Sequence, residues 1–352
     1  MSNPPSQSTT SRLWRSTFIV SAMTLLSRIA GLVRDMVFMN LFGAGKLMDA
    51  FLVAFKIPNF LRRLFAEGAF SQAFVPVLSD VRAQRGDDAV RQLINHVAGT
   101  LTLIIGSLTA VAMVFSPAII FIFAPGFHDD AVRFDLAADM LRITFPYLLL
   151  ISLTAFAGGI LNSYGRFGAS SFTPVLLNLT MIACAIWLAP LLTTPIMALA
   201  WGVLIAGIVQ LGFQWLPLRQ INLVPRFKPN FKDPDVKRIL TLMLPAMFGV
   251  SVSQINLLLD TILASFLVAG SVSWLYTAER LTELPLGLIG IAVATVILPT
   301  LSTKHAEKSD AEFRATIDWA LKVIFMVGVP ASLAMGILAE PLLASLFHHG
   351  QF

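Results

Sequence analysis

The sequence predicts an all-α polytopic membrane protein with about nine transmembrane helices, each about 20 residues or longer. Of its 352 residues 56% are hydrophobic and only 13% are charged, whereas about 25% of the residues of a soluble domain are charged. The mean hydropathy is +0.78. Most basic residues lie in short segments between apolar runs, where they direct membrane topology. No nucleic-acid-binding motif accompanies them, so the lipid bilayer and not nucleic acid is the expected environment.

Nine apolar runs are long enough to cross a bilayer, and short polar segments connect them. Proline or glycine interrupts most of these runs, and we expect kinks whose freed backbone groups bond to neighbouring helices. The predicted spans are approximately Ser16–Phe42, Asp49–Leu78, His96–Ala124, Leu136–Asn162, Ser171–Leu192, Ile196–Leu216, Ile239–Val268, Val272–Leu301 and Phe313–Phe347.

The distribution of lysine and arginine predicts the orientation of the chain. If the N-terminus is cytoplasmic, nearly all basic residues outside the spans lie on the inner side, and only Lys46 and Arg133 lie on the outer side. Inner loops of membrane proteins carry such an excess. We therefore expect residues 1–15 to form a cytoplasmic N-terminal tail.

The longest polar break, residues 219–236, predicts a cytoplasmic linker between two lobes. The N-lobe, 16–218, would hold the first six helices, and 237–352 would form a partial second lobe with helices seven to nine. Short repeats support this division, because PVLS near the end of the second span recurs as PTLS near the end of the eighth. A second lobe of equal size would extend beyond residue 352, so we expect a C-terminally truncated chain.

Charged residues inside the first two predicted helices mark the candidate site. A charge at the bilayer centre costs about 2.5–3.5 kcal/mol on insertion scales, so such side chains usually face a bundle interior or a watery cavity. Basic residues outnumber acidic ones here, and Arg280 adds another guanidinium from the repeat-related eighth span. The charged residues of the first two helices are Arg28, Arg34, Asp35, Asp49, Lys56, Arg62, Arg63 and Glu67.

An arginine surplus in a water-filled cleft predicts an anionic cargo, because the planar guanidinium binds phosphate or carboxylate and never deprotonates. Internal pairing of Arg34 with Asp49, or of Arg63 with Glu67, is the alternative, but it would leave several cations uncompensated. No nucleophile arrangement, nucleotide-binding cassette or firm metal site is present in the sequence. We therefore expect a transporter and not an enzyme, without a cofactor, driven by Na+ or another ion gradient, by the membrane potential or by the gradient of its cargo.

Several runs resemble the lipid II flippases of the MurJ (MviN) family, in the multidrug, oligosaccharidyl-lipid and polysaccharide exporter superfamily. The resemblance covers nearly the whole chain and rests above all on SRIAGLVRDMVFMNLFGAG, DAFLVAFKIPNFLRRLFAEGAFSQAFVPVLSD and SVSWLYTAERL. It implies a two-lobed alternating-access transporter of the bacterial cytoplasmic (inner) membrane. Its cargo would be lipid II, the undecaprenyl-pyrophosphate peptidoglycan precursor, moved from the inner to the outer leaflet, with a role in cell wall biogenesis and cell shape.

The resemblance also implies residue roles. Substrate-binding residues would be Arg28, Arg34, Arg62 and Arg280; gate or ion-pair residues would be Asp35, Asp49, Arg63 and Glu67. Asp260 matches a position that is acidic and ligates sodium in some members, with companion ligands from helices beyond this sequence. Partners would include cell-wall synthesis and division proteins. Alternatives are an exporter of another polyprenyl-linked glycan or of amphipathic drugs, and a wall-synthesis scaffold that does not transport.

Overall fold

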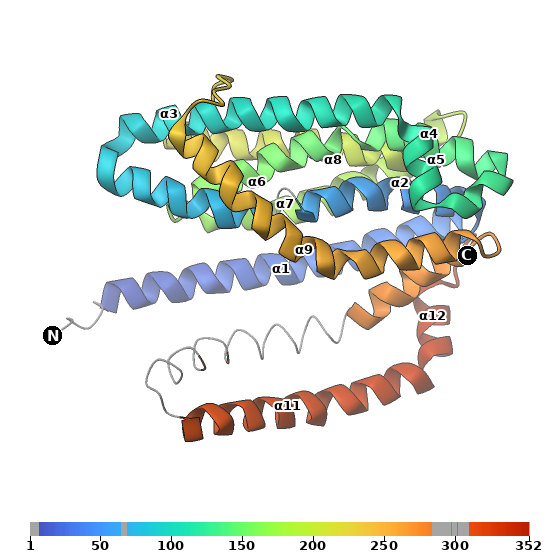
Figure 1. Ribbon diagram of the computed structural model, residues 1–352. Helices are drawn as coiled ribbons and strands as arrows, with labels where there is room; N and C mark the ends of the chain where they lie inside the picture. Colours follow the sequence, from blue (N-terminus) through green and yellow to red (C-terminus); the bar gives the residue numbers. More distant parts are fainter. Residues whose placement is uncertain (1–6, 65–68, 284–296, 298–300, 302–309, 352) are drawn as a thin grey trace.

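The computed structural model describes residues 7–64, 69–283, 297, 301 and 310–351, and these residues form helices and short connections without a strand. Most of the long helices lie side by side in alternating directions, as membrane-spanning segments joined by short loops must (Figure 1). The all-α prediction is therefore confirmed for this part of the chain.

The elements follow one another with few residues between them. Their bounds are α1 (Gln7–Phe42), α2 (Lys46–Arg62), α3 (Phe70–Val114), α4 (Ser116–Phe123), η2 (Pro125–Asp129), α5 (Ala131–Thr144), α6 (Tyr147–Ser163), α7 (Phe167–Ala183), η3 (Cys184–Leu188), η4 (Ala189–Leu191), α8 (Met197–Gln220), α9 (Pro234–Ser265), α11 (Asp310–Ile337) and α12 (Ala339–Phe347). Residues 271–283 are also helical.

Five of the described helices are long and apolar enough to cross a membrane: Phe70–Val114, Ala131–Ser163, Phe167–Leu191, Met197–Gln220 and Ala311–Ile337. The two parts of α9 meet at a bend of 49°. If both parts are counted as one span, α9 is the sixth candidate membrane helix. The predicted count of about nine is thus not confirmed. One reason is that α2 has only 17 residues. Another is that much of the predicted eighth span lies outside the described residues.

Two of the predicted or observed helical segments are interrupted, each at a residue whose backbone conformation is not helical. In α3 two helical segments meet at Gly86, whose φ of 77° favours glycine, and the chain reverses there (Figure 1). The predicted ninth span, Phe313–Phe347, is not one helix. It divides at Leu338 into α11 and α12, and α12 turns away from the axis of α11 (Figure 1).

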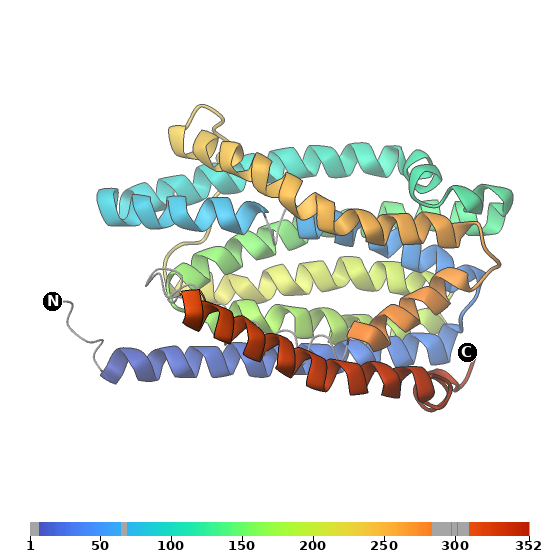
Figure 2. The same cartoon turned by 60° about the horizontal axis from the view of Figure 1, so that its bottom comes forward.

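The first eight helices pack tightly around an apolar core. Helix α7 contacts α1 and α8, α2 contacts α5, and α6 contacts α3 and α8. A cluster of rings stabilises the α3–α6 contact, with the Phe74 ring centroid 5.1 Å from that of Phe70 and 5.0 Å from that of Phe156. By contrast, only 6% of the apolar window of α11 is buried within the described structure, and this helix lies along one face (Figure 2).

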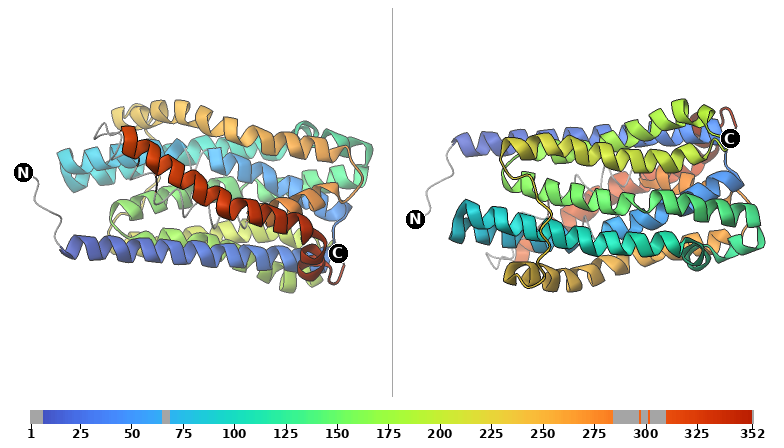
Figure 3. Two further views of the ribbon diagram at one scale, coloured as in Figure 1. Left: turned by 90° about the horizontal axis from the view of Figure 1, so that it is seen from below. Right: turned by 90° about the horizontal axis from the view of Figure 1, so that it is seen from above.

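The linker between α8 and α9 passes over α3 (Figure 3) and is hydrogen-bonded to it. Backbone amides of Arg226 and Asn230 donate to the side-chain oxygens of Asn95, at 2.7 Å, and Thr100, at 3.2 Å. Asp233 caps α9 by accepting from the amides of Asp235 and Val236, and it lies 2.7 Å from His96 Nδ1. Burial alone would raise the pKa of Asp233, but these bonds together lower it.

Gly99 lets the linker approach α3 closely, because a Cβ at this position would overlap the backbone of Lys228 and Pro229. Two turns further along α3, a Cβ on Gly106 would meet nothing nearer than 4.0 Å.

We predict that Gly99→Ala lowers the melting temperature of the detergent-solubilised protein, with a cost of about 1–3 kcal/mol for the overpacked contact. Gly106→Ala is the matched control and should be neutral or stabilising, since alanine favours a helix by about 1 kcal/mol over glycine. Equal melting temperatures for the two variants would contradict the close linker contact.

Candidate functional site

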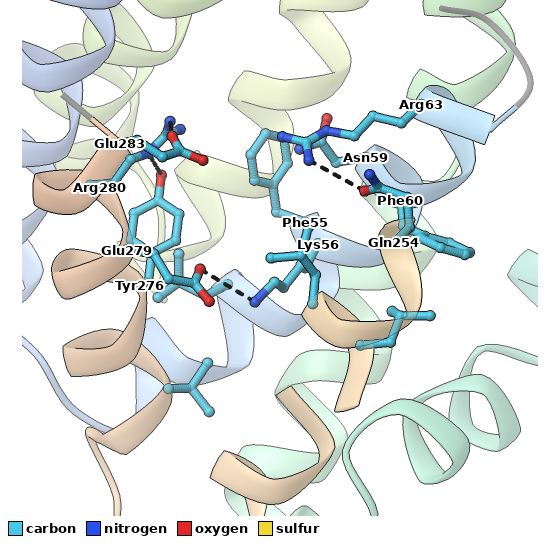
Figure 4. A pocket seen from close by; sticks show the side chains of 14 residues that line it. Phe55, Lys56, Asn59, Phe60, Arg63, Gln254, Tyr276, Glu279, Arg280 and Glu283 are labelled. Carbon is cyan, nitrogen blue, oxygen red and sulfur yellow. Dashed lines mark hydrogen bonds and ion pairs between the residues drawn. The ribbon is translucent and has the colours of Figure 1, made fainter. Parts of the chain in front are cut away.

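Two adjoining cavity compartments lie between the first helices and the helices that follow the linker. The arginine compartment, of about 220 Å³, is lined by α1, α2, α7 and the helix 271–283. The mixed compartment, of about 90 Å³, is lined by α2, α9 and the helix 271–283 (Figure 4). They share the side chains of Phe55, Asn59, Arg63, Arg280 and Glu283. The two compartments therefore form one continuous site region.

The arginine compartment carries a strong positive excess. Asp35 and Glu283 are its only acidic lining residues among those that the structure describes, against five arginines. Four of the five are the predicted substrate-binding residues. The arginines are Arg28, Arg34, Arg62, Arg63 and Arg280. The structure thus brings together guanidinium groups from α1, α2 and the helix 271–283, which are far apart in the sequence.

Asp35 holds two of these arginines in place. Arg34 Nη2 lies 2.6 Å and its Nε 2.9 Å from Asp35 Oδ1, and Arg280 Nε lies 3.1 Å from Asp35 Oδ2. Tyr276 joins them: its hydroxyl donates to Asp35 Oδ1 at 3.0 Å and accepts from both arginines. Arg280 Nη1 also donates to Glu283 Oε2 at 3.2 Å. The compartment keeps a net positive charge because five arginines line it against these two carboxylates.

Asn178 fixes Arg34 from the opposite side. Its Oδ1 accepts from Arg34 Nη1 at 3.0 Å, and its Nδ2 donates to the Ser27 carbonyl at 3.0 Å. This buried amide therefore ties α7 to two turns of α1. Between Asp35, Tyr276 and Asn178 the fork of Arg34 has little rotational freedom, and its position is set before any ligand arrives.

The mixed compartment is crossed by two contacts between α2 and the helices that follow the linker (Figure 4). Lys56 Nζ lies 3.7 Å from a Glu279 carboxylate oxygen, and Arg63 Nη1 donates to Gln254 Oε1 at 3.3 Å. The Lys56 and Glu279 side chains are only 22% and 26% exposed. Solvent therefore screens this pair less than it would a surface ion pair.

Asp49 closes the end of the bundle opposite to the linker. Its carboxylate is fully buried and accepts from the Gly270 amide at 2.7 Å, the Ser273 amide at 2.9 Å and the Ser273 hydroxyl at 2.6 Å. These donors begin the helix 271–283, where unpaired amides favour an anion. Arg133 Nη1 lies 3.9 Å from the same carboxylate. Asp49 thus joins α2 to that helix and does not take Arg34 as its partner.

A second ion cluster lies beside Asp49, at the same end of the bundle. Asp130 caps α5, and its Oδ2 lies 2.8 Å from Lys46 Nζ and 3.3 Å from Arg133 Nε. The hydrogen bond from Lys46 is the main reason why the pKa of Asp130 lies below its ordinary value.

The remaining predicted residues have other surroundings. Arg62 lines the arginine compartment and donates from Nε to Asn59 Oδ1 at 2.8 Å. Glu67 lies outside the described residues. Asp260 is exposed, and no group of acidic, histidine or cysteine side chains suited to a metal ion occurs in the described part of the chain. Its cation role therefore stays a prediction.

Tyr276, Gln254 and Glu279 were absent from the predicted set, although all three contact predicted residues. Tyr276 stands one helical turn before Arg280, so helical spacing is a signal that identifies it. Gln254 is on another helix than its partner Arg63, and no local pattern reveals that contact.

The described fold is that of the MurJ- and MATE-like transporters. A multidrug resistance MATE family transporter of the MOP superfamily, solved in an inward-facing conformation, aligns with a TM-score of 0.70 at 17% identity over 94% of this chain and 75% of that one, which shows the fold alone. The solved structure of lipid II flippase MurJ in an inward closed conformation aligns with a TM-score of 0.80 at 30% identity, covering 95% of this chain and 68% of that one.

Sequence similarity defines the family. The profile of the family described as "Lipid II flippase MurJ" matches residues 38–352. The "Probable lipid II flippase MurJ" of Vibrio cholerae is 51% identical over 348 residues, 97% of this chain and 66% of that protein. The "Lipid II flippase MurJ" of Burkholderia cenocepacia is 44% identical over 344 residues, 97% of this chain and 67% of that protein. The chain belongs to the lipid II flippase MurJ family, and it spans about two thirds of the length of these curated relatives.

We predict an acid-dependent stability difference between the protein and its Asp130→Asn variant, since asparagine still caps α5 but loses the charge. A carboxylate whose pKa is lowered on folding stabilises the fold above its ordinary pKa of 3.8, and this contribution disappears as the pH falls through the folded-state value. The difference in melting temperature should therefore be constant near neutral pH and shrink below about pH 4. In a Lys46→Gln background most of this acid dependence should be lost; its full persistence would contradict the assigned ion pair.

We also predict charge coupling across the mixed compartment. Lys56→Glu and Glu279→Lys should each lower the melting temperature by placing like charges together, and the double exchange should recover part of the loss. The coupling energy should be about 1 kcal/mol. The exposed pair Arg238–Asp80 at the linker end is the control, and its reversal should change little, because an ion pair exposed to solvent contributes little to stability. Additive losses from Lys56→Glu and Glu279→Lys would contradict the contact.

Proposed function

We propose that the two compartments bind the head group of lipid II and that the protein moves this lipid from the inner to the outer leaflet of the bacterial cytoplasmic membrane. The observation that carries the proposal is the arginine compartment, where five guanidinium groups face two carboxylates. A diphosphate provides the missing negative charge. The family membership supports lipid II as the molecule that carries this diphosphate.

The arrangement of Arg34 and Arg280 suits a diphosphate in particular. Asp35 and Tyr276 hold the two guanidinium groups side by side. Most N–H groups of Arg34 are taken by Asp35, Tyr276 and Asn178, so Arg34 contributes mainly its charge. Arg280 bonds through Nε and Nη1, which leaves its Nη2 as a charge-assisted donor to a phosphoryl oxygen. Arg28 and Arg62 line the same space. The mixed compartment adjoins it with apolar as well as polar side chains, which suits the bulkier remainder of a head group.

Transport would proceed by alternating access. In the described state Asp49 joins α2 to the helix 271–283. Opening toward the outer side would break the bonds of Asp49 and the contacts of Lys56 and Arg63. A diphosphate that attracts the arginines would compete with Asp35 and Glu283 for them. Binding and movement are coupled in this way, because the ligand changes the charge balance between the two lobes.

The finer topology is part of the same proposal. We assign residues 1–15 to the cytoplasm, 16–218 to the N-lobe, 219–236 to a cytoplasmic linker and 237–352 to a partial second lobe, with about nine spans in all. The energy source would be Na+ or the membrane potential, and cell-wall synthesis and division proteins would be partners. Export of amphipathic cationic drugs fits poorly, since the arginine excess repels a cation.

We predict that Arg28→Ala and Arg280→Ala each weaken binding of lipid II to the purified chain in nanodiscs at least tenfold, a loss of about 1.4 kcal/mol. Each should also abolish translocation in cells depleted of their own flippase, measured as lipid II accessible to a hydrolase added outside. Arg142→Ala is the control, because Arg142 is exposed on α5 and pairs with Asp139 away from the cavity.

Normal binding and translocation in both cavity variants would contradict the site. Equal affinity for another polyprenyl-linked glycan would instead favour the broader exporter. If cells with transport-inactive variants kept normal shape and wall synthesis, a scaffold role would replace the transporter role.

A further inference from the structure

We propose that a basic pocket on the linker-side end of the bundle binds the phosphate of an anionic phospholipid. The pocket, of about 580 Å³, lies between α3, the C-terminal end of α8 and the first residues of the linker. It shares no lining residue with the two cavity compartments. The inference is therefore independent of the transport site.

Three arginines, one from each of these elements, line the pocket: Arg91 on α3, Arg219 on α8 and Arg226 in the linker. No acidic residue lines it among those described. The three side chains have no hydrogen-bond or ion-pair partner within the described part of the chain, although the Arg226 backbone amide donates to Asn95. The pocket thus has three uncompensated positive charges.

Other arginines at the same end of the bundle have partners, so a cluster of arginines without partners is unusual there. Arg85 pairs with Asp235 and Arg238 with Asp80. Arg82 lies over the Tyr164 ring, 4.0 Å from its centroid, and donates to a backbone carbonyl. Arg166 bonds to Gln220. A topology-determining surplus of arginine accounts for the number of cations, but it does not account for three unpaired ones gathered around one hollow.

Helical spacing and the fixed linker hold the pocket in shape. Arg91 and Asn95 are four residues apart on α3, and Trp215 and Arg219 are four apart on α8, so each pair lies on one helix face. The Asn95 oxygen is occupied by the Arg226 amide at 2.7 Å, which fixes the linker against α3 and leaves the Asn95 NH2 group as a donor. The three guanidinium groups and the Asn95 NH2 group are donors, as a phosphate requires, and Asn222, which also lines the pocket, has an amide that can donate as well.

The surrounding side chains favour a membrane lipid over a soluble anion. Trp215 is 50% exposed, its neighbour Leu216 is 65% exposed, and both lie near the end of the apolar helix α8. Tryptophan is enriched where the bilayer meets water, at the level of the head groups. A lipid phosphate reaches the arginines at this level while its acyl chains lie along the apolar surface of α8. Basic pockets at this boundary bind anionic head groups.

The test compares the purified chain in phosphatidylcholine nanodiscs with and without phosphatidylglycerol whose acyl chains are brominated. Bromine quenches tryptophan fluorescence at short range, so Trp215 should be quenched by the anionic lipid. Trp215→Phe should remove this part of the quenching. The triple variant Arg91→Gln, Arg219→Gln and Arg226→Gln should reduce the preference for phosphatidylglycerol over phosphatidylcholine at least about tenfold.

Lys228→Gln, Lys232→Gln and Lys237→Gln together form the matched control. These three lysines are exposed, lie in the same region and do not line the pocket. Replacing them removes the same amount of charge as the triple arginine variant. The control should keep the lipid preference. An equal loss in both triple variants would overturn the proposal in favour of a diffuse surface charge.

Two further measurements keep the result interpretable. The single variant Arg219→Gln, with an unchanged circular dichroism spectrum and melting temperature, should already weaken the preference, so that misfolding of the triple variant does not decide the outcome. Inorganic phosphate and glycerol 3-phosphate should not displace the brominated lipid at millimolar concentration. Displacement by these soluble anions would identify a free-phosphate site and overturn the lipid assignment.

Discussion

Asp35 is the constraint on which the cavity depends. Guanidinium groups within an apolar bundle repel one another, and burying a charge is costly unless a partner compensates it. One carboxylate bound to both Arg34 and Arg280 offsets part of that cost without neutralising the site. Tyr276 and Asn178 share the remaining hydrogen bonds. Removing Asp35 would leave Arg34 and Arg280 facing each other without their shared carboxylate, so these ion pairs set the positions of the two arginines.

Much of this organisation could be predicted from the sequence because it follows from local rules. Apolar run lengths predicted an all-helical membrane protein. The insertion cost of charge predicted that the charged residues of the first two helices would face an interior cavity, and the internal repeat added Arg280. The division at Leu338 and the 49° bend in α9 were not predicted. By hydrophobicity alone both segments are predicted as continuous spans, because a bend interrupts an apolar run at only a few residues.

The contacts of Asp49 show where sequence reasoning ends. Pairing by charge suggested an arginine as its partner, whereas the carboxylate binds the amides of Gly270 and Ser273. A backbone N–H carries no sequence signature, and its availability depends on a helix beginning at that place in the fold. The contact between Arg63 and Gln254 was missed for another reason, because it joins side chains that are far apart in the sequence. Such interactions require the packed structure, because nothing local to either residue encodes them.

The contacts of α9 with α3 differ in kind from the contacts of α1 with the helix 271–283. His96–Asp233, Arg85–Asp235 and Asp80–Arg238 tie the start of α9 to the flank of α3, while α1 meets the helix 271–283 through the polar network around Asp35. The contact of α9 with α3 is therefore held by three ion pairs outside the cavity, whereas the contact of α1 with the helix 271–283 is held by residues that line the cavity. A movement that broke the polar network around Asp35 would therefore leave α9 in contact with α3, and the cavity would widen between α1 and the helix 271–283.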